Sequence, residues 1–191
     1  MRKIVAAINM TLDGFCDHTA ISPGEEIHQH YAELIKSADI ALYGRITYLL
    51  MEYWKSVVEN PTGDKSTDDF AVSMDRIPKV VFSHTLKNVG WQTARIAKRD
   101  LKDEVQWLKK QHGGDILVGS RSLIIALINL GLLDELQIMV HSVIVGKGLP
   151  LFEMISDRTV WNLVNTKTFG SGAVTLYYQP SNTAYKEITG V

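Results

Sequence analysis

The sequence predicts an α/β fold: a mainly parallel central sheet flanked by helices, with an antiparallel β-hairpin at the C-terminal end. Short, continuous apolar runs alternate with amphipathic helix patterns along most of the chain, which is typical of parallel strands buried on both faces. Two longer strand patterns, 160–169 and 173–179, flank a glycine-rich turn and predict the hairpin. No composition shift divides the 191 residues, so we expect one domain over 1–191.

The expected parallel strands are short and rich in apolar residues, as strands covered by helices on both faces are. They lie at 4–8, 40–43, 80–82, 116–118 and 136–141. Helix patterns fill the segments between them, and strands joined through helices in one sheet run parallel.

The first helix pattern has a marked beginning. Ser22 is its expected N-cap, Pro23 stands in the first position, and Glu25 completes a capping box. The apolar positions that follow, Ile27 and Tyr31 among them, lie on one helical face. We therefore expect a helix that starts directly after Ser22 and packs on the sheet.

Later helices are bounded by residues with strong end preferences. Asp100 is the expected cap of the helix before the strand at 116–118, and Gly131 ends the helix after it. A further helix pattern follows Gly44. The stretch 59–69 is polar, contains proline and glycine, and predicts a mobile surface loop.

Composition and charge exclude several function classes. The chain is 46% hydrophobic and 21% charged, with a formal net charge of -1 and no basic run, so we expect no nucleic-acid partner. No apolar run approaches the roughly 20 residues of a membrane span, and no signal-peptide pattern opens the chain. We therefore expect a cytoplasmic protein with no membrane partner. Cys16 is the only cysteine, which excludes an internal disulfide, and no metal site is expected.

Three expected strands end in small or hydroxylated residues. These corners are Gly44 with Arg45, Ser83 with its neighbours, and the run 119–121. At the carboxyl end of a parallel strand, backbone N–H groups and the positive end of a helix dipole favour phosphate. Arg45 and Arg121 would each stand in a first helical turn, where a cation is disfavoured by about 0.3–1 kcal/mol unless an anion is bound.

Other interpretations of these corners stay open. A glycine after a strand is often required for helix packing, an arginine is often a surface charge, and serine and threonine are common in turns. No Gly-x-Gly-x-x-Gly fingerprint follows the first strand, and no Walker sequence occurs. An ordinary Rossmann domain and a P-loop enzyme are therefore not expected.

Six short motifs follow one another along nearly the whole chain. They are Thr-Leu-Asp-Gly at 11–14, Gly-Arg-Ile-Thr-Tyr at 44–48, Pro-Lys-Val-Val-Phe-Ser at 78–83, Ile-Leu-Val-Gly-Ser at 116–120, Gly-Leu-Leu-Asp-Glu at 131–135 and Val-Ile-Val-Gly-Lys-Gly at 143–148. In this order they resemble the dihydrofolate reductase superfamily, in particular stand-alone proteins similar to the C-terminal reductase domain of the riboflavin-pathway bifunctional enzyme. The resemblance implies a sheet that binds NADPH, a dihydrofolate-reductase-like fold and a homodimer.

The resemblance also implies roles for single residues. Ala7 and Asn9 would line the nicotinamide end, and Gly146 would allow a close approach to the nicotinamide ring. Asp13 would lie in the loop that covers the site. The three corners would hold the rest of the cofactor: its phosphates through Gly44, Arg45 and Thr47, its adenosine side through Ser83, and its pyrophosphate through Gly119, Ser120, Arg121, Ser122 and Leu123.

The substrate half of the pattern departs from these families. Dihydrofolate reductases have a carboxylate on the first helix near the position where this chain has His28, which is a candidate proton donor because an unperturbed histidine has a pKa of about 6.5. Asp13, Glu25 and an ordered water are alternative donors, and a plain surface histidine is the competing interpretation. Val118 replaces a glutamate that contacts substrate in riboflavin-pathway reductases, and Ser142 replaces a usual proline.

The predicted function is NADPH-dependent hydride transfer to a small, flat heterocycle of the pterin or aminopyrimidine type. Two alternatives stay open. One is the 5-amino-6-(5-phosphoribosylamino)uracil reductase of riboflavin biosynthesis, which would need a second basic pocket that we do not find in the sequence. The other is a non-catalytic nucleotide-binding or sensing protein that keeps only the cofactor site.

Overall fold

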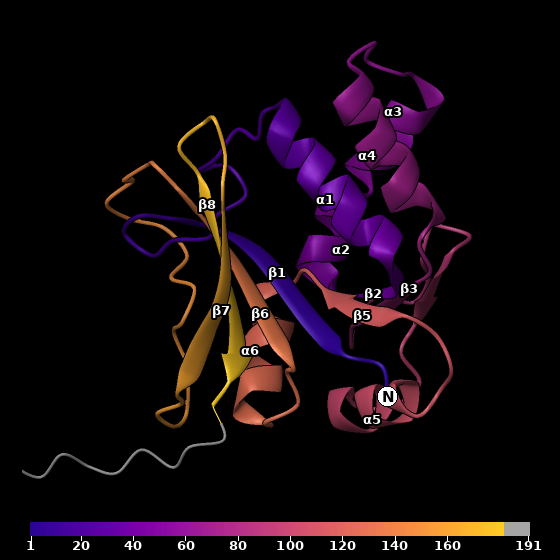
Figure 1. Cartoon of the computed structure of the whole chain (residues 1–191). Coiled ribbons are helices and arrows are strands. Elements are labelled where there is room, and N and C mark those ends of the chain that lie inside the picture. The colour runs from indigo at the N-terminus through magenta and orange to yellow at the C-terminus, as the bar shows by residue number, and fades with distance from the viewer. Residues whose placement is uncertain (182–191) are drawn as a thin grey trace, which may run out of the picture.

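The computed structural model describes residues 1–181, and in it all strands belong to one eight-stranded sheet (Figure 1). The strand order is β4-β3-β2-β5-β1-β6-β8-β7. Neighbouring strands from β4 to β6 run parallel, whereas β8 lies antiparallel between β6 and β7. The bounds are β1 Ile4–Thr11, β2 Ala38–Gly44, β3 Lys79–Phe82, β4 Ala94–Ile96, β5 Asp115–Val118, β6 Glu135–His141, β7 Trp161–Thr168 and β8 Val174–Pro180.

This topology confirms the predicted fold class, a mostly parallel sheet with a C-terminal antiparallel hairpin. The expected single domain extends over 182–191, which lie outside the described residues. Within residues 1–181, none of the helices combines the length and the apolar character needed to cross a membrane.

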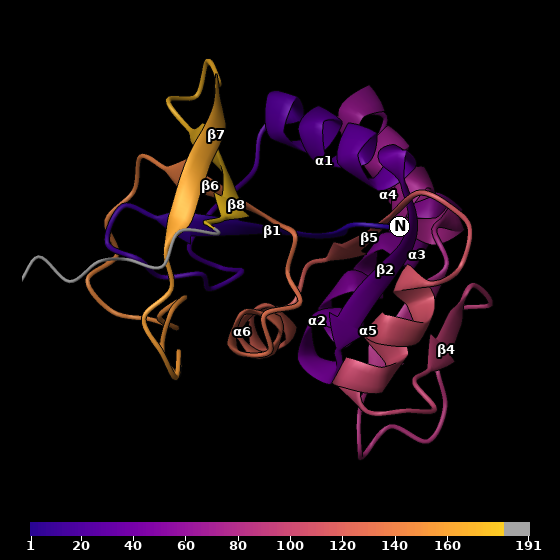
Figure 2. The same cartoon turned by 60° about the horizontal axis from the view of Figure 1, so that its bottom comes forward.

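Helices cover both faces of the sheet, as Figures 1 and 2 show. On β1, Ile4 and Ala6 pack into the core formed with α5 and α6, whereas Val5 and Ala7 pack into the core formed with α1, α2 and α4. Alternate strand residues point to opposite faces, so Asn9 follows Ala7 onto the α1 face. The helix bounds are α1 Glu25–Ser37, α2 Arg45–Met51, α3 Tyr53–Glu59, α4 Lys65–Arg76, α5 Leu101–Lys109 and α6 Arg121–Asn129.

The predicted start of the first helix is wrong. Helix α1 begins at Glu25, and its N-cap is Gly24, whose backbone is extended and which makes no side-chain cap bond. This start places two carboxylates, Glu25 and Glu26, in the first turn, where the helix dipole favours them. Glu26 Oε2 also accepts a hydrogen bond from the Gly170 N–H at 2.8 Å, which ties the helix start to the β7–β8 turn.

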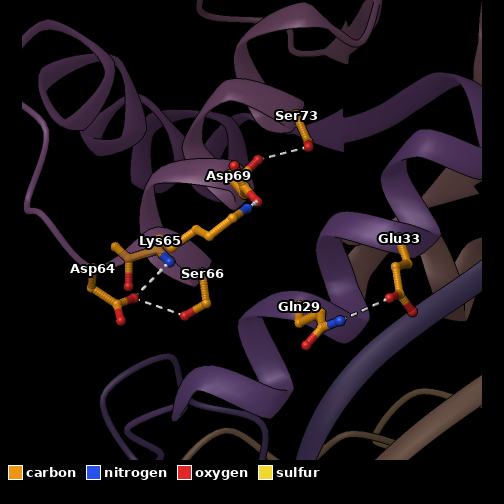
Figure 3. Close-up of polar contacts among 8 residues, drawn as sticks. Gln29, Glu33, Asp64, Lys65, Ser66, Asp69 and Ser73 are labelled. Carbon is orange, nitrogen blue, oxygen red and sulfur yellow. Dashed lines mark hydrogen bonds and ion pairs between the residues drawn. The ribbon is translucent and has the colours of Figure 1, made fainter.

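The predicted loop at 59–69 is wrong at both ends: only 60–64 lie outside helices, because Glu59 ends α3 and 65–69 belong to α4. Helix α4 begins at Lys65, and the Asp64 side chain caps it by accepting a hydrogen bond from the Thr67 N–H at 2.8 Å. Figure 3 shows this polar first turn, together with the hydrogen bond from the Ser73 hydroxyl to the Asp69 carbonyl oxygen. The sequence pattern did not indicate this helix because its first turn is polar and its apolar positions begin only at Phe70.

Two helix ends follow the prediction. Asp100 caps α5 by accepting a hydrogen bond from the Asp103 N–H at 2.9 Å. Gly131 follows α6 with a φ of 63°, the left-handed conformation that glycine adopts at little cost.

Candidate functional site

Two of the predicted corners are joined to each other. Strands β2 and β5 are parallel neighbours, so Gly44 and Gly119 lie at the same carboxyl edge. The Gly44 N–H donates a hydrogen bond of 2.8 Å to Ser120 Oγ, and Ser120 is only 1% exposed. A Cβ on Gly44 would lie 3.2 Å from Ser122 Oγ, and one on Gly119 would lie 3.3 Å from Tyr43 Cε1. We call these four residues, Gly44, Gly119, Ser120 and Ser122, the paired corner.

The two arginines beside the paired corner differ in their contacts. Arg121 Nε donates to the Pro150 carbonyl oxygen at 2.6 Å, and its Nη2 lies 3.1 Å from Glu153 Oε2. The Arg45 side chain is exposed and has no hydrogen bond or ion pair among residues 1–181. The Arg45 guanidinium is therefore free to meet an anion, whereas the Arg121 guanidinium already has a carboxylate and a carbonyl partner.

The other predicted cofactor contacts are more ordinary. Ser83 follows β3, the neighbour of β2, and its Oγ accepts hydrogen bonds from the Thr85 and Leu86 N–H groups at 3.2 and 2.9 Å. This is the turn role that the sequence left open. The Leu123 side chain is buried in the core beneath α6, so only its backbone can meet a ligand. Thr47 is half-buried on α2.

Asp13 holds the loop that follows β6. Its carboxylate accepts hydrogen bonds from Thr11 Oγ1 at 2.7 Å, from the Gly146 N–H at 2.7 Å and from the Val145 N–H at 3.1 Å. The Thr11 hydroxyl, followed by these backbone donors, keeps the pKa of Asp13 below its ordinary value. Asp13 is thus placed as an ionised acceptor that positions Gly146.

Backbone hydrogen bonds extend this contact between the two loops. Leu12 N–H donates to the Val143 carbonyl oxygen at 2.8 Å, and Cys16 N–H donates to that of Leu149 at 2.9 Å. Gly146 has a φ of 74° and nothing within 4 Å of the position a Cβ would take. The backbone of Gly146 is therefore fixed by Asp13 and still open on one side.

A polar side-chain cluster lies on the α1 face of β1. Asn9 Oδ1 is 2.9 Å from the Tyr31 hydroxyl of α1 and 2.9 Å from His141 Nε2 of β6. His141 pairs with Thr11 in the β1–β6 ladder, which places it on the same face as Asn9. Burial lowers the pKa of His141 and raises that of Tyr31 well above its usual range. We call Asn9, Tyr31 and His141 the Asn9 cluster.

Sequence reasoning named Asn9 but missed its two partners as a group. The signal for His141 was its place at the carboxyl end of a parallel strand, beside the strand that carries Asn9. The signal for Tyr31 was its helical spacing from Ile27, since both pack around Met139.

His28 does not join the Asn9 cluster and instead packs against α3 and α4. Its Nδ1 lies 3.2 Å from Thr67 Oγ1, and its ring centroid lies 5.7 Å from those of both Trp54 and Phe70. Burial lowers its pKa. Glu25 is exposed at the start of α1. In the described part of the chain, no contact joins His28 or Glu25 to Asp13 or to the Asn9 cluster.

An open cavity of about 450 Å³ lies elsewhere, between the ends of α1 and α4. Asp39 and Pro78 line it, at the amino ends of β2 and β3, and Lys36 and Arg76 add charge. It therefore lies at the sheet edge opposite the paired corner.

Comparison with known proteins gives consistent matches. The RibD C-terminal domain family matches residues 2–175. Protein YyaP of Bacillus subtilis (strain 168) is 34% identical over 185 residues, which cover 93% of this chain and 94% of YyaP. Protein YwjB of the same organism is 28% identical over 184 residues, or 93% of this chain and 97% of YwjB.

Solved structures share the fold. A putative riboflavin biosynthesis protein from Shewanella sp. PV-4 superimposes with a TM-score of 0.71 at 18% identity, covering 94% of this chain and 99% of its own. The dihydrofolate reductase of Enterococcus faecalis, in complex with NADP(H) and RAB-propyl, superimposes with a TM-score of 0.62 at 14% identity, covering 94% and 97%.

Proposed function

The chain belongs to the RibD C-terminal domain family, and we propose that it is an NADPH-dependent reductase that transfers a hydride to a small, flat heterocycle. The observation that carries this proposal is the paired corner. Two neighbouring parallel strands end there in bare backbone held together by the Ser120 hydroxyl, at the sheet edge where α/β folds bind ligands. The Enterococcus faecalis enzyme of the same fold was solved with NADP(H).

The residues at this edge fit the cofactor. A Cβ on Gly44 or Gly119 would meet neighbouring side chains at 3.2 and 3.3 Å, so both positions favour bare backbone at the edge where we place the pyrophosphate. Arg45 offers an unpaired guanidinium to a phosphate. Gly146, open on one side, lets a flat ring approach the backbone. Ala7 and Asn9 would line the nicotinamide end.

NADPH would supply the hydride, and the chain would supply position. The Ser120 hydroxyl keeps the ends of β2 and β5 in fixed relation, and the Asp13 carboxylate fixes Gly146. Holding two reactants in register accounts for a large share of catalysis in such reactions. We assign the proton that balances the hydride to solvent at this open edge, because Asp13 serves as an acceptor and His28 packs between helices.

Thermal unfolding with NADPH, with NADH and with neither tests this function. A ligand present at 100 times its Kd stabilises the folded state by about 2.7 kcal/mol, which raises the midpoint by roughly 5–10 °C for a chain of this size. We expect that rise with NADPH and a much smaller one with NADH.

Arg45→Met should remove most of the preference for NADPH, because it deletes the unpaired cation. Arg76→Met is the matched control, since Arg76 is exposed and lies at the opposite edge of the sheet. No rise with either nucleotide would refute the proposal. A rise with NADPH and no turnover of any heterocycle would instead identify a nucleotide-binding protein without catalysis.

A further inference from the structure

We propose that Asn9 is a substrate-reading residue whose locked amide group donates hydrogen bonds, so that the site takes a heterocycle through a ring carbonyl and disfavours one with an amino group in that place. This inference rests on the proposed reductase function and names its substrate class. It follows from the way hydrogen-bond donors and acceptors are matched in the Asn9 cluster.

A single atom of Asn9, its side-chain oxygen, lies within hydrogen-bond distance of both neighbours. Asn9 Oδ1 lies 2.9 Å from the Tyr31 hydroxyl and 2.9 Å from His141 Nε2. The three side chains come from β1, α1 and β6. Strands β1 and β6 are hydrogen-bonded neighbours, and Tyr31 of α1 packs against the apolar residues of both, which holds the three side chains together. His141 is only 8% exposed.

The two contacts favour one orientation of the Asn9 amide, with its oxygen toward Tyr31 and His141. An oxygen can accept from a hydroxyl and from an imidazole N–H at once. If the amide were turned, its nitrogen would face both groups, and the Tyr31 hydroxyl would lose the one acceptor that it has among residues 1–181. Leaving a donor unpaired inside the protein costs stability. The inward oxygen is therefore favoured, with the Nε2–H tautomer of His141.

The protonation states agree with this orientation. Burial lowers the pKa of His141, so the ring is neutral at pH 7 and carries a single N–H. Burial raises the pKa of Tyr31, so the hydroxyl keeps its proton. Each neighbour has one proton to donate, and both protons go to Asn9 Oδ1.

The nitrogen of the Asn9 amide has a different environment from its oxygen. Asn9 Nδ2 makes no hydrogen bond to any residue from 1 to 181, and Asn9 stays partly exposed. It stands two residues beyond Ala7 on the same face of β1, at the proposed nicotinamide end. Asn9 therefore keeps an unpaired, partly exposed NH₂ group beside the proposed nicotinamide end, where we place the substrate.

The consequence for recognition follows from donor and acceptor chemistry. An amide NH₂ only donates, so it pairs with a carbonyl oxygen and opposes an aromatic amino group, which is also a donor. The one side chain that α1 directs to this cluster, Tyr31, has its hydroxyl occupied by Asn9. No carboxylate among residues 1–181 contacts the cluster to accept from an amino group.

Two flat probes of equal size test the proposal: lumazine, which is pteridine-2,4-dione, and 2,4-diaminopteridine. Their Kd values are measured by fluorescence titration in the presence of NADPH. We expect the dione to bind at least about tenfold more tightly, since an amino group that faces the Asn9 NH₂ group would leave two donors without an acceptor. Asn9→Asp should reverse the preference, because the inner oxygen still accepts from Tyr31 and His141 while the outer one becomes an acceptor.

Two further variants make the result unambiguous. Asn162→Asp adds the same charge on the exposed face of β7 and should leave the preference unchanged. Tyr31→Phe leaves the charge unchanged but unlocks the amide, so the preference for the dione should shrink toward equality. It also covers the case in which Asn9→Asp does not fold.

The outcomes separate this inference from the proposed function. Equal binding of the probes, no binding of the dione, or a preference that Asn9→Asp and Tyr31→Phe leave intact would overturn the role of Asn9. If the protein without substitutions does not bind NADPH, the proposed reductase function itself is overturned.

Discussion

The half of the carboxyl edge that we propose for the cofactor, at β2 and β5, is built of bare backbone. The half that we propose for the substrate, at β1, α1 and β6, is built of side chains; we call them the cofactor half and the substrate half. In the cofactor half, a Cβ on Gly44 or Gly119 would be crowded by its neighbours, and the Ser120 hydroxyl joins the two strand ends. In the substrate half, three side chains share one amide oxygen. A backbone site suits a ligand whose phosphates never change, while a side-chain site can change its specificity with one substitution.

The largest expected effect comes from filling the cofactor half. Gly44→Val would place two methyl groups where a Cβ alone already lies 3.2 Å from Ser122 Oγ. We expect NADPH to lose its effect on the thermal midpoint, together with a loss of about 1–3 kcal/mol of folding free energy from overpacking. Gly24→Val is the control, because nothing lies within 4 Å of its Cβ position. A Gly44→Val protein that NADPH still stabilises fully would show that the paired corner does not hold the cofactor.

The difference between the halves also explains what the sequence could predict. Glycines and serines after apolar runs mark strand ends directly, so the amino-acid pattern by itself places Gly44, Gly119 and Ser120 at one edge of the sheet. The fold class followed from the same runs, because strand-to-helix alternation leaves few topologies. Local pattern was enough wherever backbone geometry is the feature of interest.

Side-chain clusters depend on how each helix is rotated about its axis, which local pattern does not fix. His28 and Tyr31 lie within one turn of α1, yet His28 contacts Thr67 of α4 while Tyr31 contacts Asn9 of β1. Helix α4 was missing from the sequence prediction, so nothing indicated which side of α1 it would cover. The catalytic role predicted for His28 stays untested, and its contacts are those of a helix-packing residue.

The next prediction separates the two sides of α1 by pH. Burial holds the pKa of His28 below its ordinary value near 6.5, so the unfolded chain binds the proton first as the pH falls. The contribution of the neutral His28 ring to the free energy of unfolding is complete above about pH 6.5 and is lost toward lower pH. The free energy of unfolding then changes by at most about 1.4 kcal/mol per pH unit. The slope should be smaller for a half-buried ring that water still screens.

Urea unfolding of the protein and of His28→Phe at pH 7.5 and 5.5 measures how much of the pH dependence of stability comes from His28. We expect the variant to lose less stability between the two values and to bind NADPH as before. His112→Gln, at an exposed position, is the control. A large drop in hydride transfer with unchanged stability would instead return His28 to the catalytic role that the sequence predicted.

The smallest expected effect tests the interior of the substrate half. Thr175 pairs with Met139, which pairs with Asn9, so the three residues form one row across β8, β6 and β1. Thr175 is 1% exposed, and its Oγ1 has no hydrogen-bond partner among residues 1–181. Replacing an unpaired buried hydroxyl with a methyl group removes a desolvation cost, so Thr175→Val should raise the free energy of unfolding by about 1 kcal/mol.

Urea unfolding of Thr175→Val against Thr168→Val, an exposed position on β7, makes this measurement. A gain confined to Thr175→Val would mean that the substrate half keeps an unpaired polar group at the expense of stability, unlike the cofactor half, where the buried Ser120 hydroxyl is paired. A loss of similar size would mean that the Thr175 hydroxyl is paired in solution. The two halves would then differ only in which part of the chain, backbone or side chain, presents the hydrogen bonds.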